Sequence, residues 1–403
     1  MSETATAGET GPLLIVADSY RSAEQYHLTR FLAPDAFITL QQGDDLVILA
    51  SSLEYGRASK ESRATSVRNL DEFGFRELSA AGVKGDELSA SIIDRFLSDR
   101  GVRVVDVPRA FPLGLADALR AKGIALAVRA GLEERRRTKR PDELAAIEAT
   151  QRATKEAWAL GVEALRRATV GADRVLQLDG AVFTAERLRA IVEGALLERG
   201  CGSPEGTICA PGAQAADPHQ NGTGPLRANE AIVMDIYPQN NATRYYADMT
   251  RTVSKGEPPA EIVRMYDLVR RAQDAGIAAL RPGVSGREVH ELVEDLIFAA
   301  GYDTLRPGQQ HRTGQDRPGQ QHRPGEGTPR GFIHGLGHGV GLQIHEAPSL
   351  GRAGTTPLAE GDVVTVEPGV YDPAVGGVRL EDMLVITAEG ARNLTRAPRQ
   401  LVI

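Results

Sequence analysis

The sequence is poor in cysteine and contains no long apolar run. Only Cys201 and Cys209 occur, and no Cys-x-x-Cys pair exists, which argues against a zinc site built from thiolates. Two free thiols in a reducing compartment are favoured over a disulfide or a redox role. No stretch approaches the roughly 20 apolar residues of a membrane span, and the first residues lack the basic start and apolar core of a signal peptide. We therefore expect a cytoplasmic protein without a membrane partner.

Positive charge is not in excess either. The 47 Lys and Arg residues are outnumbered by 54 Asp and Glu residues, which gives a net charge of −7. This balance offers no electrostatic basis for binding nucleic acid or an anionic membrane. The apolar fraction of 41% and the charged fraction of 25% are ordinary for a globular protein. A chain of 403 residues is expected to form two domains, or three.

Strand-like and helix-like segments alternate in the N-terminal part. Amphipathic stretches at residues 87–98 and 114–122 are predicted to be helices. Short apolar runs rich in β-branched residues are predicted to be strands at residues 13–17, 36–40, 45–50, 102–107 and 124–128. This alternation predicts an α/β layer domain. It contains neither a glycine-rich phosphate loop nor clustered His, Asp and Glu, so we interpret it as accessory.

A basic, proline-punctuated junction at residues 133–143 leads into the C-terminal part. Such a charge run is commonly a solvated linker. Pro141 is followed by two acidic residues, a combination typical of the first turn of a helix, and the helical pattern continues to about Arg167.

An eight-residue pattern occurs twice in the C-terminal part, as ALRRATVG at 164–171 and as ALRPGVSG at 279–286. Each copy ends a long helical pattern and precedes another amphipathic helix, expected at 184–199 and at 287–300. This arrangement predicts two similar α+β halves that face each other. A pocket between duplicated halves is a natural place for a site.

Residues 306–327 contain a different repeat, in which RPGQQHRTGQD is followed by RPGQQHRPGEG. The segment is rich in Gly, Pro, Gln and Arg and has almost nothing apolar, so we expect a surface excursion. An insertion that grew by duplication is favoured over a metal or substrate role for His311 and His322.

Two aspartates lie in neighbouring apolar strands, Asp235 in residues 232–238 and Asp248 in residues 245–253. The turn-like residues between them predict a hairpin, and pairing could bring both carboxylates to one face. The alternative is structural, because Asp at a strand end often caps a turn.

Residues 332–348 contain His334, His338 and His345 among four glycines. Imidazoles in a glycine-rich, apolar stretch are costly to bury without partners. A lone histidine here would more often be a satisfied core residue, whereas three in twelve residues favour a functional group. A neutral ring nitrogen of His338 could bind a metal.

Two glutamates interrupt apolar strand patterns further along. Glu367 ends the run at 363–367, and Glu381 lies in the predicted strand 377–387. Alternation places Arg379 on the same face as Glu381, where its guanidinium can hold a neighbouring carboxylate.

These segments together supply four carboxylates and one imidazole, the ligand set with which a protein holds two divalent cations and a hydroxide between them. Without metal, the carboxylates in this pocket would repel one another strongly. The members of this predicted cluster are Asp235, Asp248, His338, Glu367 and Glu381.

The ordered motifs resemble those of the pita-bread metallopeptidases, which comprise methionine aminopeptidases, Xaa-Pro aminopeptidases and prolidases. The resemblance covers roughly residues 135–403 and is carried by PHQNG at 218–222, ADMTRT at 247–252, GLGHGVGLQIHEAP at 335–348, VEPGVY at 366–371 and GVRLED at 377–382. It implies an α+β protein with a C-terminal pita-bread domain, the duplicated creatinase/aminopeptidase fold, at residues 136–403. Residues 1–135 resemble the smaller N-terminal α/β domain of the proline-directed branch, which would serve as an accessory domain.

The resemblance implies a role for each member of the cluster. Asp235 is similar to the terminal, bidentate aspartate of the second metal, whereas Asp248 and Glu381 are similar to the bridging carboxylates. His338 and Glu367 resemble the remaining ligands of the first metal. Hard oxygen ligands and one imidazole favour Mn²⁺, with Co²⁺, Fe²⁺ or Zn²⁺ as alternatives.

The same resemblance implies which groups act on substrate. Glu367 would also shuttle the proton, and His219 and His345 would stabilise the tetrahedral intermediate and position the scissile carbonyl. His334 matches a histidine near the substrate pocket, and Arg379 matches an arginine that supports the metal-bound carboxylates.

The resemblance implies that the substrate is a small peptide with proline at the second position, cleaved by a homodimeric Xaa-Pro dipeptidase. An Xaa-Pro aminopeptidase that acts on longer peptides is the alternative. The dipeptidase reading is favoured because Arg244, or the arginine-rich insertion, could hold the free carboxylate of a dipeptide. A metal-free creatinase-like hydrolase and a non-catalytic peptide-binding module are further alternatives, and the complete ligand set argues against both.

The sequence departs from the family pattern in two places. Tyr237 stands where the family usually has glycine, two positions after the first aspartate, and it begins a longer hairpin. The 306–327 insertion is the second departure. Both segments could border the pocket and change the accepted length of substrate.

Overall fold

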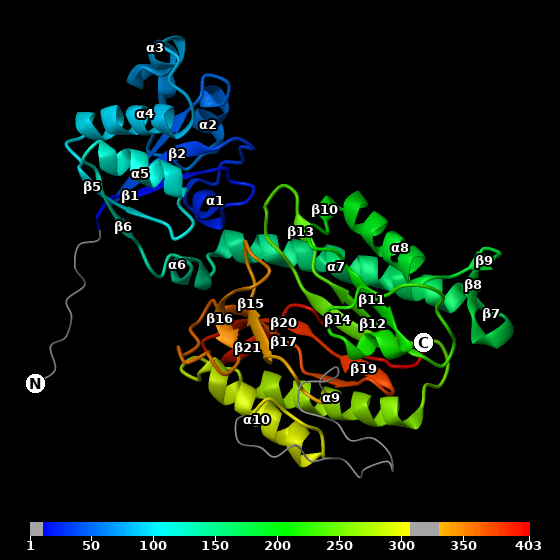
Figure 1. The fold of residues 1–403 in the computed structure, drawn as a ribbon. Helices are drawn as coiled ribbons and strands as arrows, with labels where there is room; N and C mark the ends of the chain where they lie inside the picture. The colour runs from blue at the N-terminus through cyan, green and yellow to red at the C-terminus, as the bar shows by residue number, and fades with distance from the viewer. Residues whose placement is uncertain (1–10, 307–329) are drawn as a thin grey trace, which may run out of the picture. The chain divides into compact units, whose positions relative to one another are not determined.

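The chain divides into two compact units, Met1–Arg135 and Arg136–Ile403, and each is described here by itself. The computed structural model describes residues 11–306 and 330–403 (Figure 1). The predicted insertion at 306–327, with His311 and His322, lies outside the described residues apart from Arg306. In the described parts of the chain, no helix is long and apolar enough to span a membrane.

The N-terminal unit is built on one mixed sheet with the strand order β4-β3-β2-β1-β5-β6. Strands β1, β2 and β3 pair antiparallel, and β4, β5 and β6 are added in parallel. The predicted strands are confirmed, and one, β4, had too little apolar character to be predicted. The bounds are β1 Leu13–Ala17, β2 Phe37–Gln42, β3 Asp45–Ala50, β4 Ser66–Asn69, β5 Val104–Val107 and β6 Ala125–Val128.

Helices complete the core of the N-terminal unit. The two predicted helices, α4 and α5, pack against each other and bury Phe96 and Leu119 with the sheet residue Val105. Phe73 meets Phe96 edge to face, with ring centroids 5.3 Å apart, a favoured aromatic geometry. The helices are α1 Ala23–Thr29, α2 Tyr55–Glu61, α3 Phe75–Ala80, α4 Gly85–Asp99 and α5 Leu113–Ala121.

The first half of the C-terminal unit packs α7 and α8 against the antiparallel sheet β11-β12-β14. As predicted, α7 begins at Pro141 with acidic residues in its first turn and ends at Arg167. Helix α6, Glu134–Arg137, spans the boundary between the two units. The main elements of this half are α7 Pro141–Arg167, α8 Ala185–Glu198, β11 Ile208–Pro211, β12 Ala231–Ile236 and β14 Met249–Ser254. Short strands also occur at β7 Thr169–Val170, β8 Leu176–Leu178, β9 Ala181–Val182, β10 Cys201–Gly202 and β13 Gln239–Asn240.

The second half repeats this plan, with α9 and α10 packed on the sheet β16-β15-β17-β20-β21 (Figure 1). Each copy of the sequence repeat joins the two helices of one pair, α7 to α8 and α9 to α10, which confirms the predicted duplication. The bounds are α9 Ala260–Ala279, α10 Gly286–Ala299, β15 Gly337–Gly339, β16 Glu346–Leu350, β17 Val363–Val366, β18 Gly369–Asp372, β19 Gly376–Arg379, β20 Asp382–Thr387 and β21 Gly390–Asn393.

The single strand predicted at 377–387 is wrong, because two strands of different sheets occupy this segment. Strand β19 pairs with β18, whereas β20 pairs with β17. Between them, the amide of Glu381 donates to the carbonyl of Thr250, 3.0 Å away in the sheet of the first half. The interruption between β19 and β20 therefore places Glu381 next to β14, the strand that directly follows Asp248.

Candidate metal centre

The five predicted ligands lie at strand ends or in a very short strand. Asp235 is the penultimate residue of β12, and Asp248 directly precedes β14. Because Asp235 is paired with Thr250 in the register of β12 and β14, the side chains of Asp235, Asp248 and Thr250 share one face of the hairpin. The remaining three ligands come from the sheet of the second half, around β15, β17 and β20.

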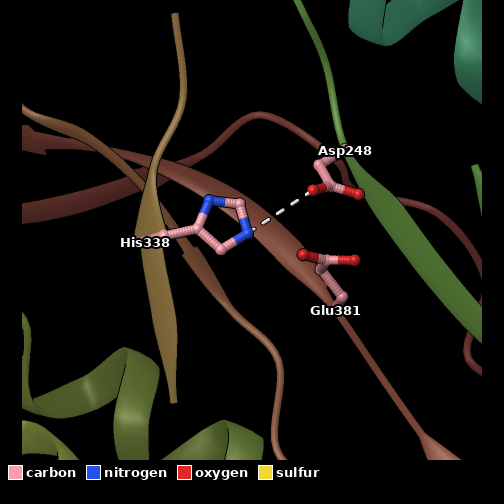
Figure 2. A group of neighbouring side chains, drawn as sticks. All are labelled: Asp248, His338 and Glu381. Carbon is pink, nitrogen blue, oxygen red and sulfur yellow. Dashed lines mark ion pairs between the residues drawn. The ribbon is translucent and has the colours of Figure 1, made fainter. Parts of the chain in front are cut away.

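Three of these side chains form a compact group. One ligand atom each from Asp248, His338 and Glu381 lies within 4.8 Å of the other two. Figure 2 shows the imidazole of His338 directed at Asp248, with the carboxylate of Glu381 facing both. His338 Nε2 is 3.7 Å from Asp248 Oδ2 and 3.2 Å from Glu367 Oε1, so Glu367 joins the group through the imidazole.

The acidic groups perturb one another because they are buried together. Burial and the neighbouring charges of Glu381, Asp235 and Glu367 raise the pKa of Asp248 well above its usual range. Burial, with Glu367 and Asp235, does the same to the pKa of Glu381. This is the self-repulsion expected of carboxylates that share a pocket without a cation.

His338 and Glu367 behave as an ion pair within this group. Burial opposes the charged forms of both, yet the hydrogen bond between them lowers the pKa of Glu367 to about 2. The same hydrogen bond, with the charges of Glu367 and Glu381, raises the pKa of His338 to about 9. A cation entering the group would replace a proton on this imidazole, since a metal ligand must be neutral imidazole.

Three buried oxygens of the predicted ligands have no hydrogen-bond partner among the described residues. Two belong to the compact group, Asp248 Oδ1 and Glu381 Oε1, and the third is Oδ1 of Asp235, on the same hairpin face as Asp248. An unsatisfied buried polar atom costs about 1–3 kcal/mol, so three in one place need a ligand. Hard oxygen donors beside one imidazole suit divalent cations. The side chains present therefore fit a metal centre.

Hydroxyl and guanidinium groups fix the orientation of the carboxylates. Arg379 Nη2 donates to Asp235 Oδ2 at 2.7 Å, and Thr250 Oγ1 donates to Glu381 Oε2 at 2.8 Å. Thr365 Oγ1 donates to Glu367 Oε1 at 3.3 Å. Such partners hold ligands in place for a metal. Both threonines were missed from the sequence, although each lies two residues from an acidic ligand and therefore on the same strand face.

Two of the three other histidines that were predicted for the site lie against the cluster. The ring of His345 is 4.3 Å from that of His338, edge to face. His334 Nε2 lies 2.9 Å from the hydroxyl of Tyr371, which also accepts from Arg379 Nη1 at 2.9 Å. Burial lowers the pKa of both His334 and His345, which favours their neutral forms. Tyr371 was not singled out from the sequence, because a tyrosine in an apolar strand has no distinguishing signal.

His219 is placed less closely. Its side chain is exposed, and its amide donates to Asp217 Oδ1 at 3.1 Å. The preceding carbonyl, that of Pro218, accepts from Arg379 Nη1 at 3.3 Å. Arg379 thus ties the His219 loop to the pocket that holds Asp235.

The duplicated α+β fold and the carboxylate-rich cluster between its sheets define a metallopeptidase-type centre. Residues 145–388 match metallopeptidase family M24, and the chain belongs to this family. The predicted resemblance is therefore confirmed.

Individual relatives agree with this assignment. The chain is 34% identical over 197 residues to the Xaa-Pro dipeptidase of Pyrococcus furiosus, a match that covers 49% of either chain. The chain thus spans about half the length of the curated relatives it matches. The prolidase structure from Pyrococcus horikoshii superposes with a TM-score of 0.75 at 24% identity, covering 98% of this chain and 96% of the other. An X-Pro aminopeptidase structure from Thermotoga maritima superposes with a TM-score of 0.76 at 22% identity, covering 98% of this chain and 97% of the other. These structures confirm the predicted pita-bread fold with a separate N-terminal α/β region.

Proposed function

We propose that this protein is an Xaa-Pro dipeptidase that uses two divalent cations. The observation that carries the proposal is the group of three buried carboxylate oxygens without partners, beside one imidazole, in a member of the M24 family. The relative named an Xaa-Pro dipeptidase supports the choice of substrate.

The proposed ligands are the predicted set. Asp248 and Glu381 would hold both cations, Asp235 would complete the ligands of one, and His338 with Glu367 would complete those of the other. When bound, the cations would supply Lewis-acid chemistry that makes water a nucleophile at neutral pH. Mn²⁺ is the proposed metal, because the donors are carboxylates and a single imidazole.

Glu367 is the proposed proton shuttle. Its carboxylate lies 3.2 Å from the ring of His338, at the metal centre, and can accept a proton from the attacking water. A proline leaving group is a secondary amine and must be protonated as the bond breaks. Glu367 can return its proton to that nitrogen, as general acid–base catalysis requires.

The histidines and Arg379 are proposed to hold substrate. His345 and His219 stabilise the oxyanion and position the scissile carbonyl, for which neutral imidazole N–H donors suffice. His334 contacts substrate while Tyr371 fixes its ring. Arg379 orients Asp235 through their ion pair, whose side chains are 4% and 13% exposed.

We further propose that residues 136–403 form the catalytic domain, that residues 1–135 are accessory, and that the protein works as a homodimer in the cytoplasm. Cys201 and Cys209 are buried free thiols, which suits a reducing compartment.

The test is hydrolysis of Ala-Pro and Ala-Pro-Ala by metal-free protein reloaded with Mn²⁺. We expect Mn²⁺-dependent release of proline from Ala-Pro and little cleavage of the tripeptide, with no activity in Glu367→Gln. Preferred cleavage of Ala-Pro-Ala would instead identify an Xaa-Pro aminopeptidase. If neither peptide were cut with Mn²⁺, Co²⁺, Fe²⁺ or Zn²⁺, the Xaa-Pro assignment would be refuted.

A further inference from the structure

Two tyrosines extend the face of the metal ligands outward along the hairpin. Tyr237 follows Asp235 by two residues, and Tyr246 precedes Asp248 by two, so alternation places them on the same face as the aspartates. The strands stay paired in this region, because the amide of Ala247 donates to the carbonyl of Pro238 at 3.1 Å. The tyrosines therefore form a wall beside the metal centre, and Tyr237 is one of the departures from the family pattern.

Glu205 lies at the outer end of this wall. The hydroxyl of Tyr246 donates to Glu205 Oε1 at 3.2 Å, and that of Tyr237 donates to the backbone carbonyl of Glu205 at 3.4 Å. Glu205 occupies a turn closed by a hydrogen bond from the amide of Gly206 to the carbonyl of Ser203, at 3.1 Å. The residue is exposed, and among the described residues no Lys, Arg or His forms an ion pair with it. A fixed and accessible negative charge thus stands beyond the two phenol rings.

The segment that ends in His345 lies between the tyrosine wall and the metal ligands. The loop before His345 is joined to the wall by the amide of Tyr246, which donates to the carbonyl of Gly341 at 2.8 Å. The ring of His345 lies 4.3 Å from that of the ligand His338, edge to face. This segment is therefore joined to Tyr246 at one end and lies against the metal centre at the other.

We propose that Glu205, held by Tyr246 and Tyr237, receives the cationic side chain of an arginine or lysine in the Xaa position of the substrate. The inference rests on the proposed Xaa-Pro activity and adds the class of Xaa. An arginine or lysine stem is apolar and can lie along the partly exposed ring of Tyr237, and its charged end gains from the face of this ring and from the carboxylate of Glu205.

Arg244 is a positive charge near the same tyrosines, and it would favour an acidic Xaa side chain in place of a basic one. Its positive charge also acts on Tyr246, where it opposes the rise in pKa that burial and Glu205 cause. If the charge of Arg244, and not that of Glu205, determined which Xaa side chain binds beside the two tyrosines, substrates with an acidic Xaa would be preferred.

The first experiment compares kcat/KM for Arg-Pro, Met-Pro and Glu-Pro in wild type, Glu205→Gln and the control Glu257→Gln. Glu257 is an exposed glutamate outside the site. We expect wild type to prefer Arg-Pro over Met-Pro by about fivefold, as for a partly exposed ion pair. This ratio should fall to about one in Glu205→Gln and persist in Glu257→Gln. An unchanged ratio in Glu205→Gln, or a wild-type preference for Glu-Pro, would overturn the proposal.

A second measurement separates this proposal from the proposed function. Calorimetry with Mn²⁺-loaded protein measures the binding of Arg-Pro and Met-Pro analogues in which a methylene replaces the scissile carbonyl. Tighter binding of the Arg analogue, lost in Glu205→Gln, would support the proposal, and equal binding would refute it. Failure to cleave every Xaa-Pro peptide refutes the activity, whereas cleavage without charge preference refutes only the role of Glu205.

Discussion

Replacing Glu381 with glutamine should remove the metal-dependent stability of the protein and leave its fold intact. Glu381 is 1% exposed. One of its oxygens accepts from Thr250, and the other is buried without a partner among the described residues. Glutamine keeps the volume and an acceptor for Thr250, but it cannot supply the charge that a bridging ligand provides.

The size of the effect can be worked out from binding linkage. A ligand present at a hundredfold its Kd stabilises the folded state by about 2.7 kcal/mol. In a unit the size of Arg136–Ile403, each kcal/mol shifts the melting temperature by about 2 °C, so Mn²⁺ should raise that of wild type by about 5 °C. Without metal, burial and neighbouring carboxylates raise the pKa of Glu381 well above its usual range. The metal-free variant, relieved of this repulsion, should melt at the wild-type temperature or slightly above it.

The assay is a thermal melt with EDTA and with Mn²⁺, combined with hydrolysis of Ala-Pro. We expect a shift of about 5 °C in wild type and in the control Glu257→Gln, and neither a shift nor activity in Glu381→Gln. A full Mn²⁺ shift or full activity in Glu381→Gln would refute the assignment of a bridging carboxylate and, with it, the two-metal centre.

Three further changes test other parts of the site. Tyr371→Phe removes the hydroxyl between His334 and Arg379, so kcat/KM for Ala-Pro should fall about tenfold while stability changes by only about 1 kcal/mol; an unchanged kcat/KM would exclude this role. Arg244→Ala should reduce the preference for Ala-Pro over Ala-Pro-Ala, and an unchanged preference would show that Arg244 does not hold the substrate carboxylate. Deletion of residues 306–327 removes almost no apolar side chain, so a cooperative melt within about 2 °C of wild type is expected; loss of cooperative melting would contradict this.

The sequence by itself determined most of the secondary structure and the residue types of the centre. Strands such as β3 could be predicted because apolar, β-branched runs between turn residues carry a local signal, and α7 was marked by Pro141 and its acidic neighbours. His338 and Glu367 could be named because an ionisable side chain inside an apolar stretch is costly unless it has a partner. The spaced motifs then identified the family.

Only the tertiary structure decided how these residues meet. The break before Glu381, which brings it beside Asp248, depends on a hydrogen bond to Thr250, a residue more than a hundred positions earlier. The proposed site at Glu205 likewise depends on a distant contact, because the turn that carries Glu205 comes within hydrogen-bond distance of Tyr246. Local periodicity sets which face a side chain occupies, but pairing between distant strands sets which faces meet. The pKa values of the ligands follow from this packing, because burial and neighbouring charges shift them away from the values of the isolated side chains.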